Sequence, residues 1–287
     1  MFLDNKFVFE NKDHDYDGVV NNKGEINAFQ NGHIAFIAPE VTNEGIVKVA
    51  SGGSVSMLAG DKVTIHFNGN KLINYSVDKG TVNALVENHN AIEVIDGIVI
   101  LSAQGVSQIE SAVINNSGII KADSMTSVGG KVFLSSSNQV ANSGTISTNS
   151  YADQGGHIQV TANDIYIQAG SVLEAKGTGD GGKILIGGSW QNSDPSVQQA
   201  TTTNVESGTI INASSTYSGD GGEVVVWSDI NDANSITRAN GTIYAKGGTL
   251  DGNGGRVETS GGKVSVNNIS VNTTAENGFA GIWLLDP

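Results

Sequence analysis

Apolar and polar residues alternate along most of the chain in short runs separated by glycine. Glycine pairs precede three of these runs, at positions 129–130, 155–156 and 181–182. The apolar positions that follow the pairs are Val132, Leu134, Ile158, Val160, Ile184 and Ile186. Alternation at period two is typical of a β-strand with one buried face. Glycine before such a run marks a turn that needs a positive φ or close backbone approach.

These runs recur at a fixed spacing. Gly118, Gly144 and Gly170 stand 26 residues apart, and the glycine pairs keep the same step. From Gly24 a shorter repeat runs at about 20 residues. In a repeat architecture each unit covers the apolar face of its neighbour. Short strands with no helical linker between copies therefore predict an all-β fold, a parallel β-helix.

We expect one β-helical segment over residues 1–287, with roughly ten to twelve coils between residues 19 and 271. The alternation also predicts which side chains point into the core: Val132, Val160, Ile184, Val224 and Val257. Outward positions lie one residue away, because successive side chains of a strand point to opposite faces of the sheet.

Three segments interrupt the period. The spacing changes near residues 81–88 and 104–114, and in the second segment Val106, Ile109 and Val113 fit one helical face. We therefore expect short helices at 81–88 and 104–114. Between Gly181 and Gly221 the step grows to 40 residues, and the excess falls on residues 188–203, which predicts an extended loop.

Composition narrows the function classes. The net charge of −14 argues against nucleic acid or an anionic membrane as a partner, since both need basic patches. Cysteine is absent, so neither disulfides nor thiolate chemistry is available. No apolar run is long enough to insert into a membrane, and no signal peptide is present. If the protein is secreted, we expect its targeting segment outside this sequence.

Metal-site candidates are weak. Asp13, Asp15 and Asp17, followed by Gly18, imitate the start of an EF-hand calcium loop. The twelfth position, which needs a bidentate glutamate, is Gly24, and neither flank has helical periodicity. A solvated acidic turn is the better interpretation. Acidic residues beside later glycine turns favour turn formation in the same way: Asp180, Asp220 and Asp251.

Other motifs lack the context that their chemistry needs. The glycine-rich run 177–183 is close to a P-loop, but Ile184 replaces the magnesium-binding Ser or Thr and a strand follows instead of a helix. His157 is expected on the surface, in solvent. Three tryptophans are possible sugar platforms, although nothing else supports a shared sugar site: Trp190, Trp227 and Trp283. We expect no cofactor.

Several segments together resemble the filamentous-haemagglutinin-like exoproteins of two-partner secretion systems. The resemblance spans nearly the whole chain, in the family's order. It rests on residues 19–28 (VVNNKGEINA), 34–39 (IAFIAP), 59–64 (AGDKVT), 113–118 (VINNSG), 221–227 (GGEVVVW), 254–261 (GGRVETSG) and 283–287 (WLLDP).

This resemblance implies a right-handed β-helix, and secretion across a Gram-negative outer membrane by a barrel transporter. It also implies work as an adhesin that projects binding regions toward an unidentified receptor, for example a glycan. The family's Asn-Pro-Asn motifs are missing. We therefore expect that the amino-terminal secretion domain and the downstream regions lie outside this sequence, and that this segment is the shaft.

A polysaccharide-active β-helix enzyme, a lyase or hydrolase, is the alternative. Such enzymes cluster carboxylates with Arg or Lys on one face. This chain has only two arginines, Arg238 and Arg256, and no dense run of carboxylates and cations. The sequence therefore favours a non-catalytic adhesive protein, secreted or displayed on the cell surface.

Overall fold

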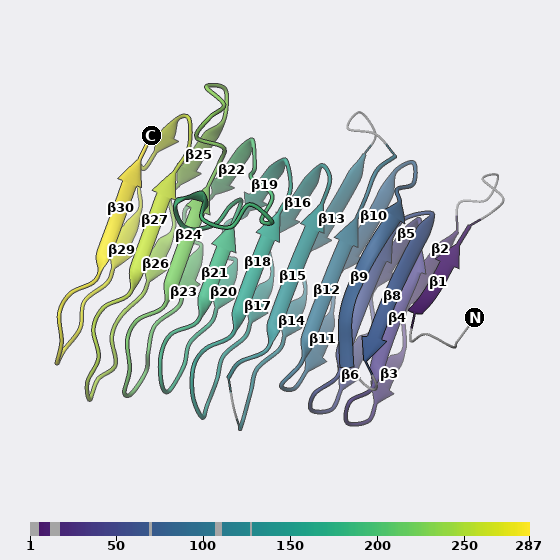
Figure 1. Cartoon of the computed structure of the whole chain (residues 1–287), viewed down its shortest axis with the longest axis horizontal. Helices are drawn as coiled ribbons and strands as arrows, with labels where there is room; N and C mark the ends of the chain where they lie inside the picture. The colour runs from purple at the N-terminus through teal and green to yellow at the C-terminus, as the bar shows by residue number, and fades with distance from the viewer. Residues whose placement is uncertain (1–5, 12–17, 69–70, 107–110, 127) are drawn as a thin grey trace.

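Three long parallel sheets run side by side along the molecule and form a β-helix (Figure 1). The computed structural model describes residues 6–11, 18–68, 71–106, 111–126 and 128–287. Each sheet has nine strands, one from each coil. The predicted fold class is confirmed, with fewer coils than the expected ten to twelve. The difference arises because residues 62–79 and 187–201 lie outside the stack.

The coil visits the three sheets in a fixed order. Sheet 1 contains β2 (Val19–Asn22), β5 (Glu40–Asn43), β10 (Ala84–Asn88), β13 (Ala112–Asn116), β16 (Gln139–Asn142), β19 (Asp164–Ile167), β22 (Thr202–Val205), β25 (Ile236–Ala239) and β28 (Val264–Ser265). Sheet 2 contains β3 (Glu25–Ala28), β6 (Ile46–Val49), β11 (Ala91–Val94), β14 (Ile119–Lys121), β17 (Thr145–Ser147), β20 (Val172–Glu174), β23 (Ile210–Asn212), β26 (Thr242–Tyr244) and β29 (Ser270–Asn272). Sheet 3 contains β4 (His33–Ala38), β7 (Ser54–Ala59), β12 (Ile98–Ala103), β15 (Lys131–Ser136), β18 (His157–Thr161), β21 (Lys183–Ile186), β24 (Glu223–Trp227), β27 (Arg256–Ser260) and β30 (Ile282–Asp286).

The core is a set of columns that run along the axis. In sheet 3, Val132 pairs with Ile158, and the column continues through Ile184, Val224 and Val257. The inward predictions are confirmed, because all five predicted side chains are fully buried: Val132, Val160, Ile184, Val224 and Val257. Each inward side chain therefore packs on its equivalents in the coils above and below.

A row of buried asparagines marks the corner between sheets 1 and 2. The Nδ2 of Asn22 donates to Oδ1 of Asn43 at 2.8 Å, and Asn43 donates in the same way to Asn88 at 2.8 Å. Asn88 continues the row to Asn116 at 2.8 Å, and Asn116 to Asn142 at 2.7 Å. Each buried amide thus satisfies the next, which is how a polar row can lie in a core.

The glycine pairs stand where successive coils approach most closely. A Cβ on Gly156 would lie 2.1 Å from the carbonyl oxygen of Gly130, and a Cβ on Gly182 would lie 2.2 Å from that of Gly156. Such contacts exclude any side chain. Close backbone approach therefore explains the glycine pairs that mark the repeat.

A small antiparallel sheet lies outside the stack. It consists of β1 (Lys6–Glu10), β8 (Lys62–Asn68) and β9 (Lys71–Lys79), in the order β1-β8-β9. The apolar alternation of residues 63–67 does mark a strand, but the strand belongs to this sheet and not to a coil. Its buried residues Val63 and Ile65 pack on Leu58 and Ile100 from the outer face of sheet 3.

The helix expected over residues 81–88 is wrong. Thr81 forms an isolated parallel bridge to Gly105, and β10 begins at Ala84. Ala84, Val86 and Asn88 are buried and Leu85 and Glu87 between them are partly exposed, which is a period of two. The antiparallel hairpin inserted just before this segment displaces the repeat, so the strand appeared out of phase.

The helix expected over residues 104–114 is also wrong. The bridge at Gly105 and the strand β13 from Ala112 leave no described helix, and residues 107–110 lie outside the described part. Ala112 and Ile114 are the buried residues, while Val113 points outward and Val106 is 53% exposed. The described members of the apparent helical face, Val106 and Val113, therefore both lie away from the core, and the buried positions are those of a strand.

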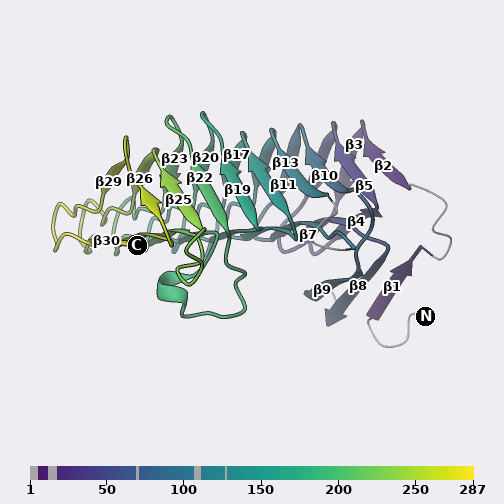
Figure 2. The same ribbon diagram turned by 90° about the horizontal axis from the view of Figure 1, so that it is seen from above.

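Residues 187–201, here called the covering loop, leave the stack between β21 and β22 and return along the outer face of sheet 3. They contain η1 (Trp190–Asn192), a short 3-10 turn. Figure 2 shows this loop projecting from the same side of the β-helix as β8 and β9. One face of the β-helix therefore carries two separate additions.

Candidate functional surface

The covering loop buries an apolar patch on the outside of sheet 3. Leu185, Val225 and Trp227 project outward from the coils and pack against Val197 of the loop. Trp227 is 1% exposed, and its Nε1 donates to Oε1 of Gln199 at 2.9 Å. Trp227 points outward as its place in the strand predicts, but a covered indole offers no ring face to a sugar.

The other two tryptophans do not join Trp227 in a sugar platform. Trp190 packs against the patch below the loop, and the guanidinium of Arg256 lies 4.5 Å from its ring centroid. Trp283 stands in the last coil in register with the inward Val257, and its Nε1 donates to Oγ1 of Thr259 at 3.2 Å. The three indoles therefore have different structural surroundings.

An ion-pair cluster stands beside the covering loop. The carboxylate of Glu223, which is 7% exposed, lies 2.9 Å from Nζ of Lys183 and pairs on its other oxygen with Arg256. The three residues occupy equivalent positions in adjacent coils. Both carboxylate oxygens are paired with cations, so the cluster joins three adjacent coils.

Glu258 holds the covering loop against the stack. It is 1% exposed, and its Oε2 accepts a hydrogen bond from the backbone N–H of Gln191 at 2.7 Å. Its Oε1 accepts from the hydroxyl of Ser260 at 3.1 Å. Burial raises the pKa of this carboxyl above its usual value, and the two hydrogen bonds partly oppose that rise.

The expectation that His157 lies on the surface, in solvent, is wrong. Its ring is largely enclosed and packs edge-on against Phe133, with centroids 5.6 Å apart. Its Nε2 is buried and has no hydrogen-bond partner among the described residues. Burial, followed by the charges of Lys183 and Lys131, lowers the pKa of the imidazole to about 4. Phe133 and the adjacent coils, distant in sequence, cause this burial.

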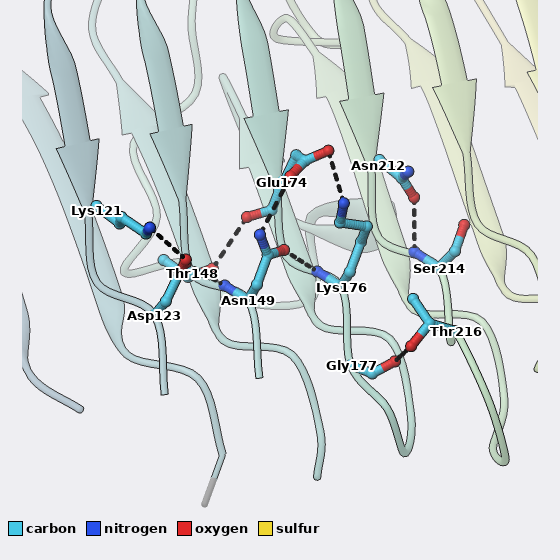
Figure 3. Close-up of polar contacts among 10 residues, drawn as sticks. All are labelled: Lys121, Asp123, Thr148, Asn149, Glu174, Lys176, Gly177, Asn212, Ser214 and Thr216. Carbon is cyan, nitrogen blue, oxygen red and sulfur yellow. Dashed lines mark hydrogen bonds and ion pairs between the residues drawn. The ribbon is translucent and has the colours of Figure 1, made fainter. Parts of the chain in front are cut away.

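A row of polar side chains follows sheet 2, at the turn that leads away from it (Figure 3). In its first part every group is bound. Asp123 accepts from the backbone N–H of Asn149 at 2.8 Å and lies 3.7 Å from Nζ of Lys121. Asn149 donates to Glu174 at 3.1 Å, and Glu174 lies 2.9 Å from Nζ of Lys176. This part forms a closed network.

The second part of the row lies in the next two coils and borders a groove of about 460 Å³. Asn212 accepts at Oδ1 from the backbone N–H of Ser214 at 3.0 Å. Ser214 accepts at Oγ from the backbone N–H of Lys246 at 3.0 Å. The backbone thus fixes both side chains, whose donor groups have no partner among the described residues. Tyr244 and Ser215 also line this groove.

The metal candidates do not form a site in the part of the chain that the structure describes. Asp13, Asp15 and Asp17 lie outside the described residues. No group of three or more potential ligands occurs among the residues that are described. Asp180 accepts from the backbone N–H of Asp220 at 2.8 Å, and Asp220 from that of Asn253 at 2.6 Å. These aspartates stabilise turns between coils.

The P-loop-like run 177–183 is a coil turn, as expected. Gly177 bridges Ser150 and Ser215 in the adjacent coils, and β21 starts at Lys183. The amides of Gly181 and Gly182 donate to the carbonyls of Asp220 and Ala175, both at short range (2.8 and 2.7 Å). The structure therefore commits these amides to the protein itself, and they are not available to a phosphate.

The polar row after sheet 2 was not predicted from the sequence. A signal for it exists: a small inward residue and then a polar one follow five successive strands of sheet 2, from β14 to β26, at matching positions in successive coils. The inward residues are Ala122, Thr148, Ala175, Ala213 and Ala245. The polar residues one position later are Asp123, Asn149, Lys176, Ser214 and Lys246. The row becomes visible when the coils are aligned on their strands.

Within the described residues, no helix has the length and apolar character needed to cross a membrane. No model of a known protein family matches the sequence, and no curated protein matches it. A solved structure does match: the crystal structure of the HMW1 secretion domain from Haemophilus influenzae. The two share 27% identity with a TM-score of 0.77, and the match covers 98% of this chain and 70% of the other.

The likeness to this secretion domain extends beyond overall shape, since it includes more than a quarter of the residues and nearly the full length of the chain. It agrees with the resemblance carried by the sequence motifs and with the nine-coil parallel β-helix. In fold and in sequence motifs the chain is therefore similar to the secretion domain of a two-partner secretion exoprotein.

Proposed function

We propose that this chain is the segment of a secreted exoprotein through which an outer-membrane barrel transporter recognises its cargo. The match to a secretion domain over 98% of the chain carries this proposal. It replaces the expectation that the secretion domain lies outside this sequence and that the chain is only a shaft. The absence of Asn-Pro-Asn motifs suggested a shaft, whereas the similarity to a secretion domain favours a role in export.

In this proposal the whole exoprotein is delivered to the surface of a Gram-negative cell or to the medium, and serves adhesion. The β-helix supports such a role because it is an extended scaffold whose columns repeat along one axis, with long faces available to a partner.

A non-catalytic role is also part of the proposal. The ion-pair cluster of Glu223, Lys183 and Arg256 is the arrangement closest to the carboxylate–cation sites of β-helical polysaccharide enzymes. Both oxygens of Glu223 are bound by cations. Incubation of the protein with acidic polysaccharides is expected to release no reducing ends or unsaturated products. Release of either product would support the enzyme alternative.

Export is tested in a Gram-negative host. The chain carries a periplasmic targeting signal and an epitope tag, and is produced with or without the transporter that exports its own exoprotein. We expect tagged protein in the medium only when the transporter is present. An unrelated β-helical protein with the same signal and tag is the matched control and should stay in the periplasm. Equal release with and without the transporter would refute the proposal.

A further inference from the structure

The groove beside the second part of the polar row has a surplus of hydrogen-bond donors. The Nδ2 of Asn212, the hydroxyls of Ser214 and Tyr244, and the ammonium of Lys246 have no partner among the described residues. Ser215 is 4% exposed and lines the groove, and its Oγ is buried without a partner in that same part of the chain. A buried polar group without a partner is costly, so a site of this kind needs an explanation.

The first part of the same row provides an internal comparison. There Asn149 occupies the position that Ser214 occupies two coils later. Its backbone N–H donates to Asp123, its side-chain amide donates to Glu174, and its Oδ1 accepts from the backbone N–H of Lys176. That network consumes its own donors, as Figure 3 shows. The unused donors therefore occur in the later coils, which lack the carboxylates that accept the donors of the first part.

The side chains of Asn212 and Ser214, which carry two of these donors, are held in place before any ligand arrives. The Oδ1 of Asn212 is fixed by the amide of Ser214, and the Oγ of Ser214 by the amide of Lys246. Thr216, which also lines the groove, donates its hydroxyl to the carbonyl of Gly177 at 2.9 Å. Preorganised groups lose less conformational freedom when a ligand binds. Their free ends together require a ligand rich in acceptor oxygens.

We propose that this groove binds a short saccharide that carries a carboxylate. Hydroxyl and ring oxygens of a sugar suit the amide and hydroxyl donors, and the half-buried ring of Tyr244 offers an apolar face beside them. The ammonium of Lys246, unpaired within the described chain, receives the carboxylate. Binding here is independent of export.

The charge of the groove limits the ligand to a short one. Lys176 already pairs with Glu174, and Glu276 adds a negative charge to the lining. The whole chain carries a net charge of −14, which repels a long polyanion. A single carboxylate close to Lys246 is affected mainly by its neighbours, since solvent ions screen charges beyond about 8 Å at physiological salt.

The test uses the complete chain and a matched pair of probes, trigalacturonate and its methyl ester, with binding measured by ligand-observed NMR and calorimetry. We expect saturable binding of trigalacturonate that weakens with salt, and binding of the ester at least about fivefold weaker. Lys246→Gln is expected to weaken binding of the acid about tenfold with little effect on the ester. Glu276→Gln is expected to strengthen binding of the acid about two- to fivefold.

Lys263→Gln is the control, because Lys263 is exposed and does not line this groove. It should leave both affinities unchanged, and the melting temperature of each variant verifies folding. No saturable binding, equal binding of acid and ester, or an unaltered affinity in Lys246→Gln would overturn the proposal. A triglutamate peptide that binds as well as trigalacturonate would overturn the assignment to a saccharide.

Discussion

The imidazole of His157 lies between cationic neighbours on the outer face of sheet 3. Lys131 and Lys183 occupy the equivalent positions in the adjacent coils, and Glu223 follows one coil further. Burial and the two lysines disfavour the protonated ring, and only Glu223 favours it, so the pKa falls to about 4. At neutral pH this residue is therefore an uncharged aromatic group that separates charged ones.

The depressed pKa of His157 makes stability depend on pH. In the unfolded chain a histidine has a pKa of about 6.5, so between that pH and 4 the unfolded state binds a proton that the folded state rejects. The free energy of unfolding therefore falls as pH falls through this window. Between pH 7 and pH 5, we expect the free energy of unfolding of His157→Gln to fall by about 2 kcal/mol less than that of the unmodified protein, measured by urea denaturation. Parallel losses in both proteins would contradict this account.

Ile184 occupies the middle of an inward column of sheet 3 and is fully buried between Ile158 and Val224. Ile184→Ala is expected to lower the free energy of unfolding by about 2–5 kcal/mol, because it removes buried methyl groups and leaves a cavity. Lys131→Ala is the control on the same sheet, since Lys131 is exposed, and should change it by less than about 0.5 kcal/mol. Similar losses in the two variants would contradict the assigned packing.

Among the elements, the buried asparagine row joins five coils through side-chain amides alone. Its members come from β2, β5, β10, β13 and β16, and the next strand, β19, places Ile167 at the equivalent position. The row therefore changes from polar to apolar at this point along the axis. Each internal amide both donates and accepts, so the loss of one member affects two others.

Asn116→Ala tests this dependence. Truncation leaves the donor of Asn88 and the acceptor of Asn142 without their partner, and we expect a loss of about 1–3 kcal/mol in the free energy of unfolding. Asn115→Ala is the matched control. Asn115 is partly exposed and donates to Glu87 at 3.1 Å on the outside, so its removal should cost much less. Equal losses in the free energy of unfolding for Asn116→Ala and Asn115→Ala, by thermal and urea denaturation, would contradict this role of the row.

The sequence was sufficient for elements whose contacts repeat locally. Alternation and glycine spacing predicted the strands after Gly118 and the inward side chains, because each coil copies the register of the previous one. It was insufficient near residues 81–88, where the inserted hairpin displaces the period. The partner of that hairpin, β1, lies more than fifty residues earlier in the chain, and antiparallel pairing over such a distance leaves no periodic signal.

The candidate surfaces were predictable only in part. Trp227 was correctly expected to point outward, but its burial depends on residues 187–201, which have no repeat. The unused donors of Asn212 and Ser214 depend on which groups the adjacent coils provide, about thirty residues away in sequence. A row of this kind is therefore recognised from the stack and not from any single motif.

At the scale of the whole molecule, we expect the net charge and the exposed last coil of this chain to govern its self-association. In the last coil Trp283 is 40% exposed and Leu285 46% exposed, although their positions are inward ones in every earlier coil. Exposed apolar groups beside a strand edge favour pairing with another chain. The net charge of −14 opposes this at neutral pH and vanishes near the pI of about 4.6.

We therefore expect a monomer at pH 8 and larger species near pH 4.6, measured by sedimentation velocity at micromolar concentration. Removal of residues 279–287 serves as the control and should alter the species formed at low pH, because it removes β30. A compact dimer at pH 8 that persists after this removal would mean that a lateral face, not the last coil, carries the contact.

Because equivalent residues pair from coil to coil, the number of coils sets the length of this molecule and leaves its cross-section unchanged. Lys131 and His157 occupy the same position, so the 26 residues between one and the next return the chain to its starting point in the cross-section, one strand spacing further along. Gain or loss of such a unit changes reach and preserves every column, whereas a single inserted residue inverts the side chains of the strand that contains it. A β-helix built in this way can evolve its length in whole coils without redesigning its core.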